Sequence, residues 1–283
     1  MTGGIVDAHH HVWDLAVRDQ AWISGPALAP LRRTFTLDDL APYARAAGVR
    51  ATVLVQTVTV PDETPELLAL ADRRHPLPAA VVGWTDLTAP GVTDALAALR
   101  ALPGGRRLAG VRHQVQDEPD PAWLLRPDVL RGLAAVADAG LVYDLVVRPH
   151  QLAAATRAAA LLPGLTFVLD HLGKPPVATG GIAHWARRVR ALAALPNTVC
   201  KLSGLVTEAA PGHWTAADLI PYADTVLDAF GPDRLMFGSD WPVCLVAAGY
   251  GEVVATARTL TNGLTDAERH AVFAGTATRV YGL

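Results

Sequence analysis

The chain has 283 residues, 51% of them hydrophobic, and carries a net charge of −3. It contains no Lys/Arg-rich run and no stretch of 18 apolar residues, which argues against a nucleic-acid or membrane partner and favours a small-molecule substrate. The N-terminus lacks a signal-peptide pattern, and Cys200 and Cys244 each lie in an apolar run. We therefore expect buried free thiols and a cytoplasmic protein.

Short apolar, β-branched runs alternate along the whole chain with Ala/Leu-rich stretches of helical periodicity. Strands are expected at 5–11, 51–57, 79–86, 108–114, 141–148, 166–171, 198–203 and 234–240. Helices are expected at 64–74, 93–102, 127–139, 151–162, 182–195, 217–230 and 250–260. Eight strand–helix units without a linker predict a single α/β domain over residues 1–283, a (β/α)₈ TIM barrel.

A doubly wound open sheet is the competing arrangement. Such a sheet calls for a glycine-rich turn after the first strand, whereas this chain has HHHVWDLA there. The connection over residues 12–36 is long and non-periodic, and long loops of this kind commonly act as lids. We therefore favour the barrel and expect a lid after its first strand.

The first strand ends in three consecutive histidines, His9, His10 and His11. Because side chains alternate along a strand, His9 and His11 should share one face, about 6.6 Å apart, with His10 on the other. Together with His171 after the sixth strand and Asp240 after the eighth, they form a ligand set suited to one divalent metal ion such as zinc. The alternative is that these side chains satisfy backbone groups at the barrel mouth.

Other polar residues also fall at strand ends. Asp240, in GSDWPV, is either the base for an attacking water or a capping residue. Arg112 and His113 either bind substrate oxygens or pair with Asp117 and Glu118 in the next loop.

Three further residues complete the candidate substrate-binding set. Lys201, beside Ser203, is positioned either to stabilise developing negative charge or to form a loop ion pair. Trp84 and Trp241 are interpreted as part packing and part pocket wall, since indole offers an apolar face and one donor.

Several stretches occur in an order that resembles a known family. They are DAHHHVWD at 7–14, VVGWTDL at 81–87, GVRHQVQDEPDPAWLLRPDVLRGL at 110–133, VLDHLGKPP at 168–176, CKLSGLVTEA at 200–209, PYADTVLDAFGPDRLMFGSDWPVC at 221–244 and the closing VYGL. Together they resemble the amidohydrolase superfamily, and within it the branch of sugar-acid lactonases.

The resemblance implies a (β/α)₈ barrel with His9 and His11 as its H-x-H pair, the strand 6 histidine at His171 and the strand 8 aspartate at Asp240. It also implies aldonolactone substrates such as L-fuconolactone and L-rhamnonolactone, with 2-pyrone-4,6-dicarboxylate hydrolysis as a related activity. Members with two metals use a carbamylated lysine or a glutamate after strand 4 and a histidine after strand 5. This chain has VRHQ and VVRPH there, so we expect at most one metal ion, and some lactonases of this branch work with none.

We therefore expect a hydrolase that opens a sugar-acid lactone, with Asp240 activating water and His9, His11 and His171 stabilising the oxyanion. One alternative is a zinc-dependent decarboxylase of aromatic acids on the same barrel, against which GSDWPVC and HLGKPP favour a lactonase. A non-catalytic sugar-acid binder is the other alternative, and it would have no need of a base. The sequence leaves a homo-oligomer open.

Overall fold

The computed structural model describes residues 4–73, 75, 77–210 and 212–283. Within these residues, eight parallel strands form one sheet in the order β1 to β8. The strands are β1 Ile5–His10, β2 Val49–Val55, β3 Ala80–Gly83, β4 Leu108–His113, β5 Val142–Leu145, β6 Phe167–Leu169, β7 Thr198–Leu202 and β8 Leu235–Phe237. Each of the predicted strands overlaps one of these.

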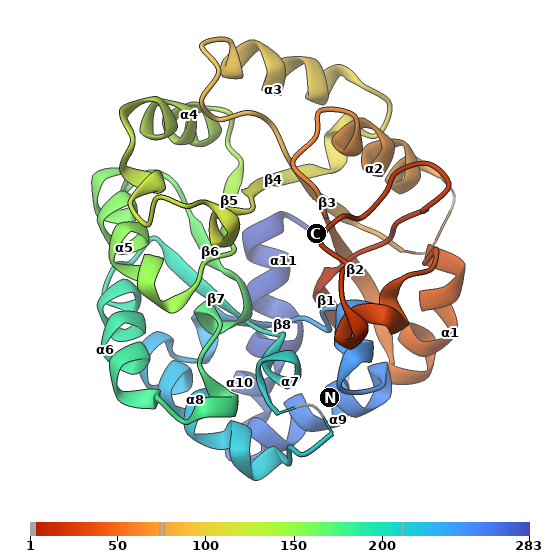
Figure 1. The fold of residues 1–283 in the computed structure, drawn as a ribbon, viewed down its shortest axis with the longest axis vertical. Helices are drawn as coiled ribbons and strands as arrows, with labels where there is room; N and C mark the ends of the chain where they lie inside the picture. The colour runs from red at the N-terminus through yellow and green to blue at the C-terminus, as the bar shows by residue number, and fades with distance from the viewer. Residues whose placement is uncertain (1–3, 74, 76, 211) are drawn as a thin grey trace.

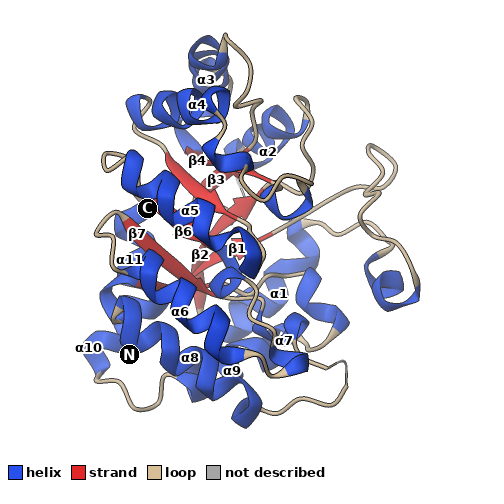
Figure 2. Ribbon diagram, turned by 60° about the vertical axis from the view of Figure 1, so that its left-hand side comes forward, coloured by secondary structure: helices blue, strands red, loops and turns tan. Residues whose placement is uncertain are grey.

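Helices surround the strands on the outside, as Figure 2 shows. They are α1 Leu37–Ala47, α2 Glu63–Asp72, α3 Val92–Ala101, α4 Pro127–Asp138, α5 Leu152–Leu161, α6 Ile182–Ala193, α7 Leu205–Glu208, α8 Ala216–Phe230, α9 Tyr250–Leu260, α10 Asp266–His270 and α11 Thr276–Tyr281. The predicted helices correspond to α2 to α6, α8 and α9, and Arg74, the last residue predicted for the first of them, lies outside the described residues. Helix α1 is not among the predictions, although Thr36 and Asp39 form a capping box at its start.

The sheet closes between the end of β1 and the segment after β8. His10 and Trp241 form a parallel bridge. The amide of His11 donates to the carbonyl of Trp241 at 2.7 Å, and the amide of Asp240 donates to the carbonyl of His9 at 2.8 Å. The (β/α)₈ barrel predicted from the sequence is confirmed, and its closure places His9, His11 and Asp240 side by side.

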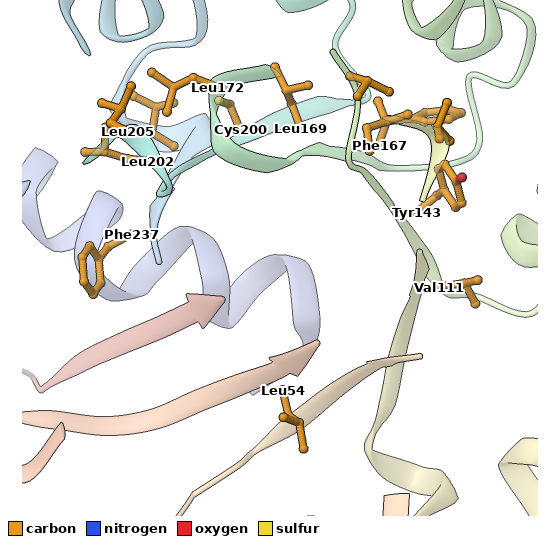
Figure 3. Packing of buried hydrophobic residues seen from close by; sticks show 14 of the residues in the cluster. Leu54, Val111, Tyr143, Phe167, Leu169, Leu172, Cys200, Leu202, Leu205 and Phe237 are labelled. Carbon is orange, nitrogen blue, oxygen red and sulfur yellow. The ribbon is translucent and has the colours of Figure 1, made fainter. Parts of the chain in front are cut away.

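Apolar residues on the outer face of the strands pack against the surrounding helices. Figure 3 shows several of them, including Phe167, Leu169 and Leu202. The inner face carries a second apolar cluster that contains Val53, Val168 and Met236, and helix α11 contributes to it. In Figure 1 the strand labels surround α11, so this C-terminal helix closes one end of the barrel.

Three further features of the structure concern smaller points of the sequence analysis. Cys200 and Cys244 are buried and free, as expected. The described part of the chain has no helix long and apolar enough to cross a membrane. The segment 12–36 is irregular except for a short 3₁₀ helix, Pro26–Leu31, and the guanidinium of Arg18 ties it to α2 through two hydrogen bonds to Glu66, of 2.8 and 2.9 Å.

Candidate active site

Three histidines and one aspartate converge at the mouth of the barrel. The Nε2 atoms of His9 and His11 are 3.1 Å apart. The Oδ1 atom of Asp240 lies 3.7 Å from Nε2 of His9, 3.6 Å from Nε2 of His11 and 3.8 Å from Nε2 of His171. All four side chains are buried. The structure thus brings together the four residues that the sequence pattern proposed as a set.

An irregularity in β1 aims the histidines. The strand register shifts between Asp7 and His10, which indicates a bulge. His9 and His11 then face the inside of the barrel, while Nε2 of His10 lies 2.8 Å from the hydroxyl of Thr52 on β2. His10 is therefore held by the neighbouring strand, apart from the other two, as the alternation predicts.

The backbone is unusual at two of the four residues. His171 and Asp240 have φ values of 52° and 58°, in the left-handed region that non-glycine residues seldom adopt. Glycines give the site room: a Cβ on Gly204 would lie 2.5 Å from Nδ1 of His171, and one on Gly238 would lie 2.7 Å from Cβ of His9. Such strain persists only where the surrounding structure enforces it, and it is concentrated at functional sites.

Hydrogen bonds at the far side of each ring orient the histidines. Nδ1 of His11 lies 2.7 Å from the carbonyl oxygen of Val55, which can only accept, so Nδ1 carries the proton and Nε2 presents its lone pair. Nδ1 of His171 lies 2.9 Å from the hydroxyl of Ser203. Partners of this kind fix the tautomer and ring orientation of metal-binding histidines.

Burial and charge together set the protonation states. Burial lowers the pKa of His171 to about 4 and holds the pKa of His9 well below its ordinary value. Burial alone would raise the pKa of the Asp240 carboxyl, but attraction to His171 and contact with His11 and His9 bring that pKa well below its ordinary value. At neutral pH the site therefore presents the uncharged imidazoles of His9 and His171 beside the Asp240 carboxylate.

This donor set fits a divalent metal ion. Zn–N bonds of about 2.0–2.1 Å at tetrahedral angles place two ligand nitrogens about 3.3 Å apart, close to the His9–His11 spacing of 3.1 Å. Within the described residues, two combinations of suitable donors have their ligand atoms close together, His9, His11 and Asp240 in one and His9, Asp170 and His171 in the other, and they share His9. Asp170 is already paired with Arg112 and Lys201, so Asp240 is the better carboxylate ligand.

Below the histidines, a layer of charged side chains crosses the inside of the barrel. Nζ of Lys201 donates to Asp144 Oδ2 at 2.5 Å and lies 3.0 Å from Asp170 Oδ1. Nη1 of Arg112 donates to Asp170 Oδ2 at 3.0 Å. Nδ1 of His9 lies 3.3 Å from Asp170 Oδ1 and 3.1 Å from Lys201 Nζ, so the layer supports His9 directly. Two cations balance two carboxylates in this layer.

The pKa values of the two carboxylates in the layer shift in opposite directions. Burial raises the pKa of Asp144 to about 6, against the attraction of Lys201. Burial would do the same to Asp170, but Lys201, His9 and Arg112 surround it and hold its pKa well below the ordinary value. Asp144 also accepts a hydrogen bond from the hydroxyl of Tyr281 on α11, 3.0 Å from each oxygen.

A cavity of about 350 Å³ adjoins the converging residues. Trp22 and Leu28, from the segment 12–36, form part of its wall. The rest of the wall is rich in polar groups: His11, Thr57, Arg112, Gln114, Gln116, Asp117, Arg148, His171, Lys174, Thr207, Glu208 and Asp240. A small ligand with many oxygen atoms would find both donors and acceptors on this wall.

The sequence matches the amidohydrolase family over residues 6–283. The chain belongs to the amidohydrolase family. It is 43% identical to an L-fucono-1,5-lactonase from Burkholderia multivorans over 98% of this chain and 96% of the relative. It is 39% identical to an L-fucono-1,5-lactonase from Burkholderia ambifaria over 87% of this chain and 83% of the relative. The predicted family and enzyme class, a hydrolase, are confirmed.

A solved structure agrees with this assignment. An amidohydrolase from Burkholderia multivorans that contains bound zinc is 42% identical to this chain, and the two superpose with a TM-score of 0.92 over 99% of this chain and 100% of that one. The barrel architecture of this amidohydrolase is thus shared along its whole length with a relative known in atomic detail.

The five predicted substrate-binding residues of this amidohydrolase lie in different places. Arg112 lines the cavity. His113 lines an adjoining hollow, where Nδ1 accepts from Trp84 Nε1 at 3.0 Å and Nε2 lies 2.7 Å from Glu118 Oε1, which is the loop pairing considered as its alternative. Lys201 and Trp241 are 0% and 1% exposed and do not line the cavity. Lys201 instead neutralises the carboxylates of the charged layer, so it supports the site from below.

Three residues that form or contact the charged layer are absent from the sequence-based prediction. Asp144 and Asp170 each stand two positions after an inward-facing valine, Val142 and Val168. Asp170 lies at the end of the predicted strand 166–171, so the strand-end signal was available for it, whereas Asp144 falls in the middle of the predicted strand 141–148. Tyr281 carries no such signal, because only the three-dimensional fold brings α11 to the barrel floor.

Proposed function

We propose that this amidohydrolase hydrolyses the lactone of a small sugar acid, with aldono-1,5- and aldono-1,4-lactones as its substrate class. The observation that carries the proposal is the convergence of one carboxylate and three imidazoles at a polar cavity of about 350 Å³. The two L-fucono-1,5-lactonases that are 43% and 39% identical support the substrate class.

In the proposed reaction, Asp240 accepts a proton from the water that attacks the lactone carbonyl. Its low pKa keeps it ionised at neutral pH. Its Oδ1 faces the imidazoles, beside which the carbonyl oxygen of the lactone would lie. The attack forms a new C–O bond and places negative charge on the former carbonyl oxygen. A hydrogen-bond donor fixed in advance beside that oxygen stabilises the charge without reorganising and is typically worth about 3–4 kcal/mol. An imidazole can act in this way only where its Nε2 carries the proton, which excludes His11.

Collapse of the tetrahedral intermediate breaks the bond between the carbonyl carbon and the ring oxygen. Asp240 returns its proton to the departing oxygen, which becomes the hydroxyl of the open-chain acid. One water is consumed and one hydroxy acid is formed, which loses its carboxyl proton at neutral pH. His171 is proposed to take part by orienting the carbonyl, because its Nε2 is the nitrogen directed toward Asp240.

We propose His9, His11, His171 and Asp240 as the ligands of one zinc ion. The zinc in the relative that is 42% identical supports this identity, as does the imidazole and carboxylate donor set. Bound zinc would supply Lewis-acid polarisation of the carbonyl. Metal analysis of the purified protein should find about one zinc per chain, and removal by a chelator should lower both activity and the thermal midpoint.

The substrate hydroxyls would lie against Arg112 and the polar wall of the cavity. Arg112 is held in place by Asp170 and by the side-chain oxygen of Gln56, at 3.0 Å each. His113, Trp84 and Trp241 would contribute indirectly, by supporting the residues of this wall. Lys201 would contribute through its contact with Nδ1 of His9. Direct contact with substrate is proposed for Arg112, since it alone among the five lines the cavity.

The proposal is tested with a panel of lactones and one variant. The wild type should hydrolyse L-fucono-, L-rhamnono-, L-galactono-, D-arabinono- or D-xylonolactone well above the spontaneous rate, followed as acid release. Asp240→Asn should lose roughly 10²- to 10⁴-fold of that activity, the usual contribution of a general base. Asn is among the residues that best tolerate a positive φ, so the backbone at position 240 should be retained.

Other outcomes would point elsewhere. Turnover of an aromatic carboxylate, without activity on any lactone, would favour the decarboxylase alternative. Binding of sugar acids without turnover of any compound would favour the non-catalytic binder. Full activity in Asp240→Asn, with lactone hydrolysis intact, would remove Asp240 from the mechanism while leaving the substrate class in place.

A further inference from the structure

A second concave site adjoins the catalytic cavity. Its volume is about 400 Å³. Arg148, Lys174 and Glu208 belong to the walls of both sites, so the two lie next to each other. We call this site the basic groove and define it by its charged and imidazole side chains, Arg148, His150, Lys174, His184, Arg188 and Glu208.

The basic groove carries an excess of positive charge in a chain whose net charge is −3. Glu208 is its one carboxylate, and it is already paired with Lys174 at 3.2 Å. Arg188 donates to the carbonyl oxygen of Pro149 at 2.7 Å, and no carboxylate lies within ion-pair distance of it in the described residues. Arg148 donates to the carbonyl of Gln116 at 3.1 Å and has only a long contact, 3.8 Å, to Asp117.

These bonds to carbonyl oxygens hold the two guanidinium groups without neutralising them. Each arginine uses one of its five N–H donors in the bond described, so donors remain for a ligand. The backbone at Lys174 has a φ of 53°, a left-handed conformation that is costly for a lysine. Lys174 is also one of only two lysines in the sequence, and the other, Lys201, lies in the charged layer below the active site.

We propose that the basic groove binds the carboxylate of the hydroxy acid that the reaction releases. This inference rests on the proposed function, because hydrolysis turns an uncharged lactone into an anion. Arginine presents parallel N–H donors that match the two oxygens of a carboxylate, and a charge-assisted bond of this kind is stronger than a neutral one. The product meets Arg148 and Lys174 as it leaves the cavity, whereas the uncharged substrate gains nothing from their charge.

The variant Arg188→Gln isolates the groove, because Arg188 lines the groove and not the catalytic cavity. We expect its affinity for sodium L-fuconate, measured by calorimetry and as product inhibition, to fall roughly tenfold, the size of one lost charge-assisted bond. The kcat/KM for the uncharged L-fuconolactone, from initial rates, should stay within about twofold of wild type. Arg188→Lys should recover part of the affinity.

The matched control is Arg187→Gln, an exposed arginine that is the neighbour of Arg188 on α6 and does not line the groove. It should bind L-fuconate as the wild type does. Equal binding in Arg188→Gln and wild type would overturn the proposal, as would equal losses in both variants. Inorganic phosphate that binds as tightly as L-fuconate and depends equally on Arg188 would overturn the assignment to a carboxylate.

The two proposals fail in different ways. Calorimetry with L-fuconate reports on the groove whether or not the protein turns over a lactone. Absence of lactone turnover with Arg188-dependent binding of L-fuconate would remove the proposed function and the product role together, and leave an anion site. Lactone turnover with binding that ignores Arg188 would remove the groove alone.

Discussion

Two layers of side chains fill the inside of the barrel, and the same strands supply both. On β5, Val142 faces inward and so does Asp144 two positions later; Val168 on β6 and Asp170, the residue after that strand, do the same. Side chains two positions apart lie on one face of a strand, about 6.6 Å from each other. The inner apolar cluster, which contains Val142, Val168 and Met236, therefore forms a lower layer. The charged layer, which contains Asp144, Asp170 and Lys201, forms an upper layer next to it.

The two layers differ in what they contribute. The lower layer is stabilised by burial of apolar surface and closed by α11. The upper layer gains little in stability, because removing two cations and two carboxylates from water costs about as much as their attraction returns. The upper layer contributes to function instead, because Asp170 and Lys201 contact Nδ1 of His9 and hold its ring in place. Stability therefore resides mainly in the lower layer, and the upper layer positions the site.

The largest effect is expected from the substitution Lys201→Met in the upper layer. It leaves Asp144 and Asp170 facing each other across the barrel without their shared cation, and removal of one partner of a buried ion pair typically costs about 3–5 kcal/mol. His9 also loses a contact at Nδ1, so kcat should fall by about 10- to 100-fold, as for other partners of metal ligands. Urea unfolding and steady-state kinetics measure the two effects.

A double variant separates those effects. In Lys201→Met with Asp144→Asn, the pair of Arg112 and Asp170 remains balanced. Most of the lost stability should return while kcat stays low. If kcat recovered together with stability, Lys201 would be needed only for folding.

The corresponding change in the lower layer is Met236→Ala. Met236 is fully buried on the inner face of β8, and truncation of a buried methionine typically costs about 2–5 kcal/mol. The kcat of the folded variant should stay within about twofold of wild type, because no hydrogen bond or ion pair of the described residues joins Met236 to His9, His11, His171 or Asp240. Denaturant unfolding and kinetics well below the melting temperature check this, and a large loss of kcat with little loss of stability would reverse the assignment of roles.

The sequence predicts the strands, the barrel and the four converging residues, because these follow from periodicity and from the alternation of side chains. It does not predict which charged side chains of the upper layer pair with one another. Lys201 reads equally well as a ligand for substrate or as part of an ion pair, since its partner Asp144 is 57 positions away in the chain. The left-handed backbone at His171 and Asp240 is equally invisible in the sequence, because non-glycine residues seldom adopt it and only the surrounding tertiary structure enforces it.

The smallest expected effect comes from the link between the two layers, the hydroxyl of Tyr281. Tyr281→Phe keeps the ring in the lower layer and removes only the donor to Asp144. A hydrogen bond to a charged group is worth about 1.5–3 kcal/mol. Tyr222→Phe is the matched control, because its hydroxyl donates to the uncharged carbonyl of Pro176 at 3.3 Å, and such a bond is worth about 0.5–1.5 kcal/mol.

Both variants should lose some stability in urea unfolding, and Tyr281→Phe should lose more. Only Tyr281→Phe should also lower kcat, by a few-fold and with little change in KM, because a freed Asp144 shifts Lys201 and through it His9. Metal content after dialysis against a weak chelator gives a second measurement, and it should fall in Tyr281→Phe alone. If the two variants have equal kcat and retain metal equally, α11 closes the barrel without influencing the site, and the layers are independent.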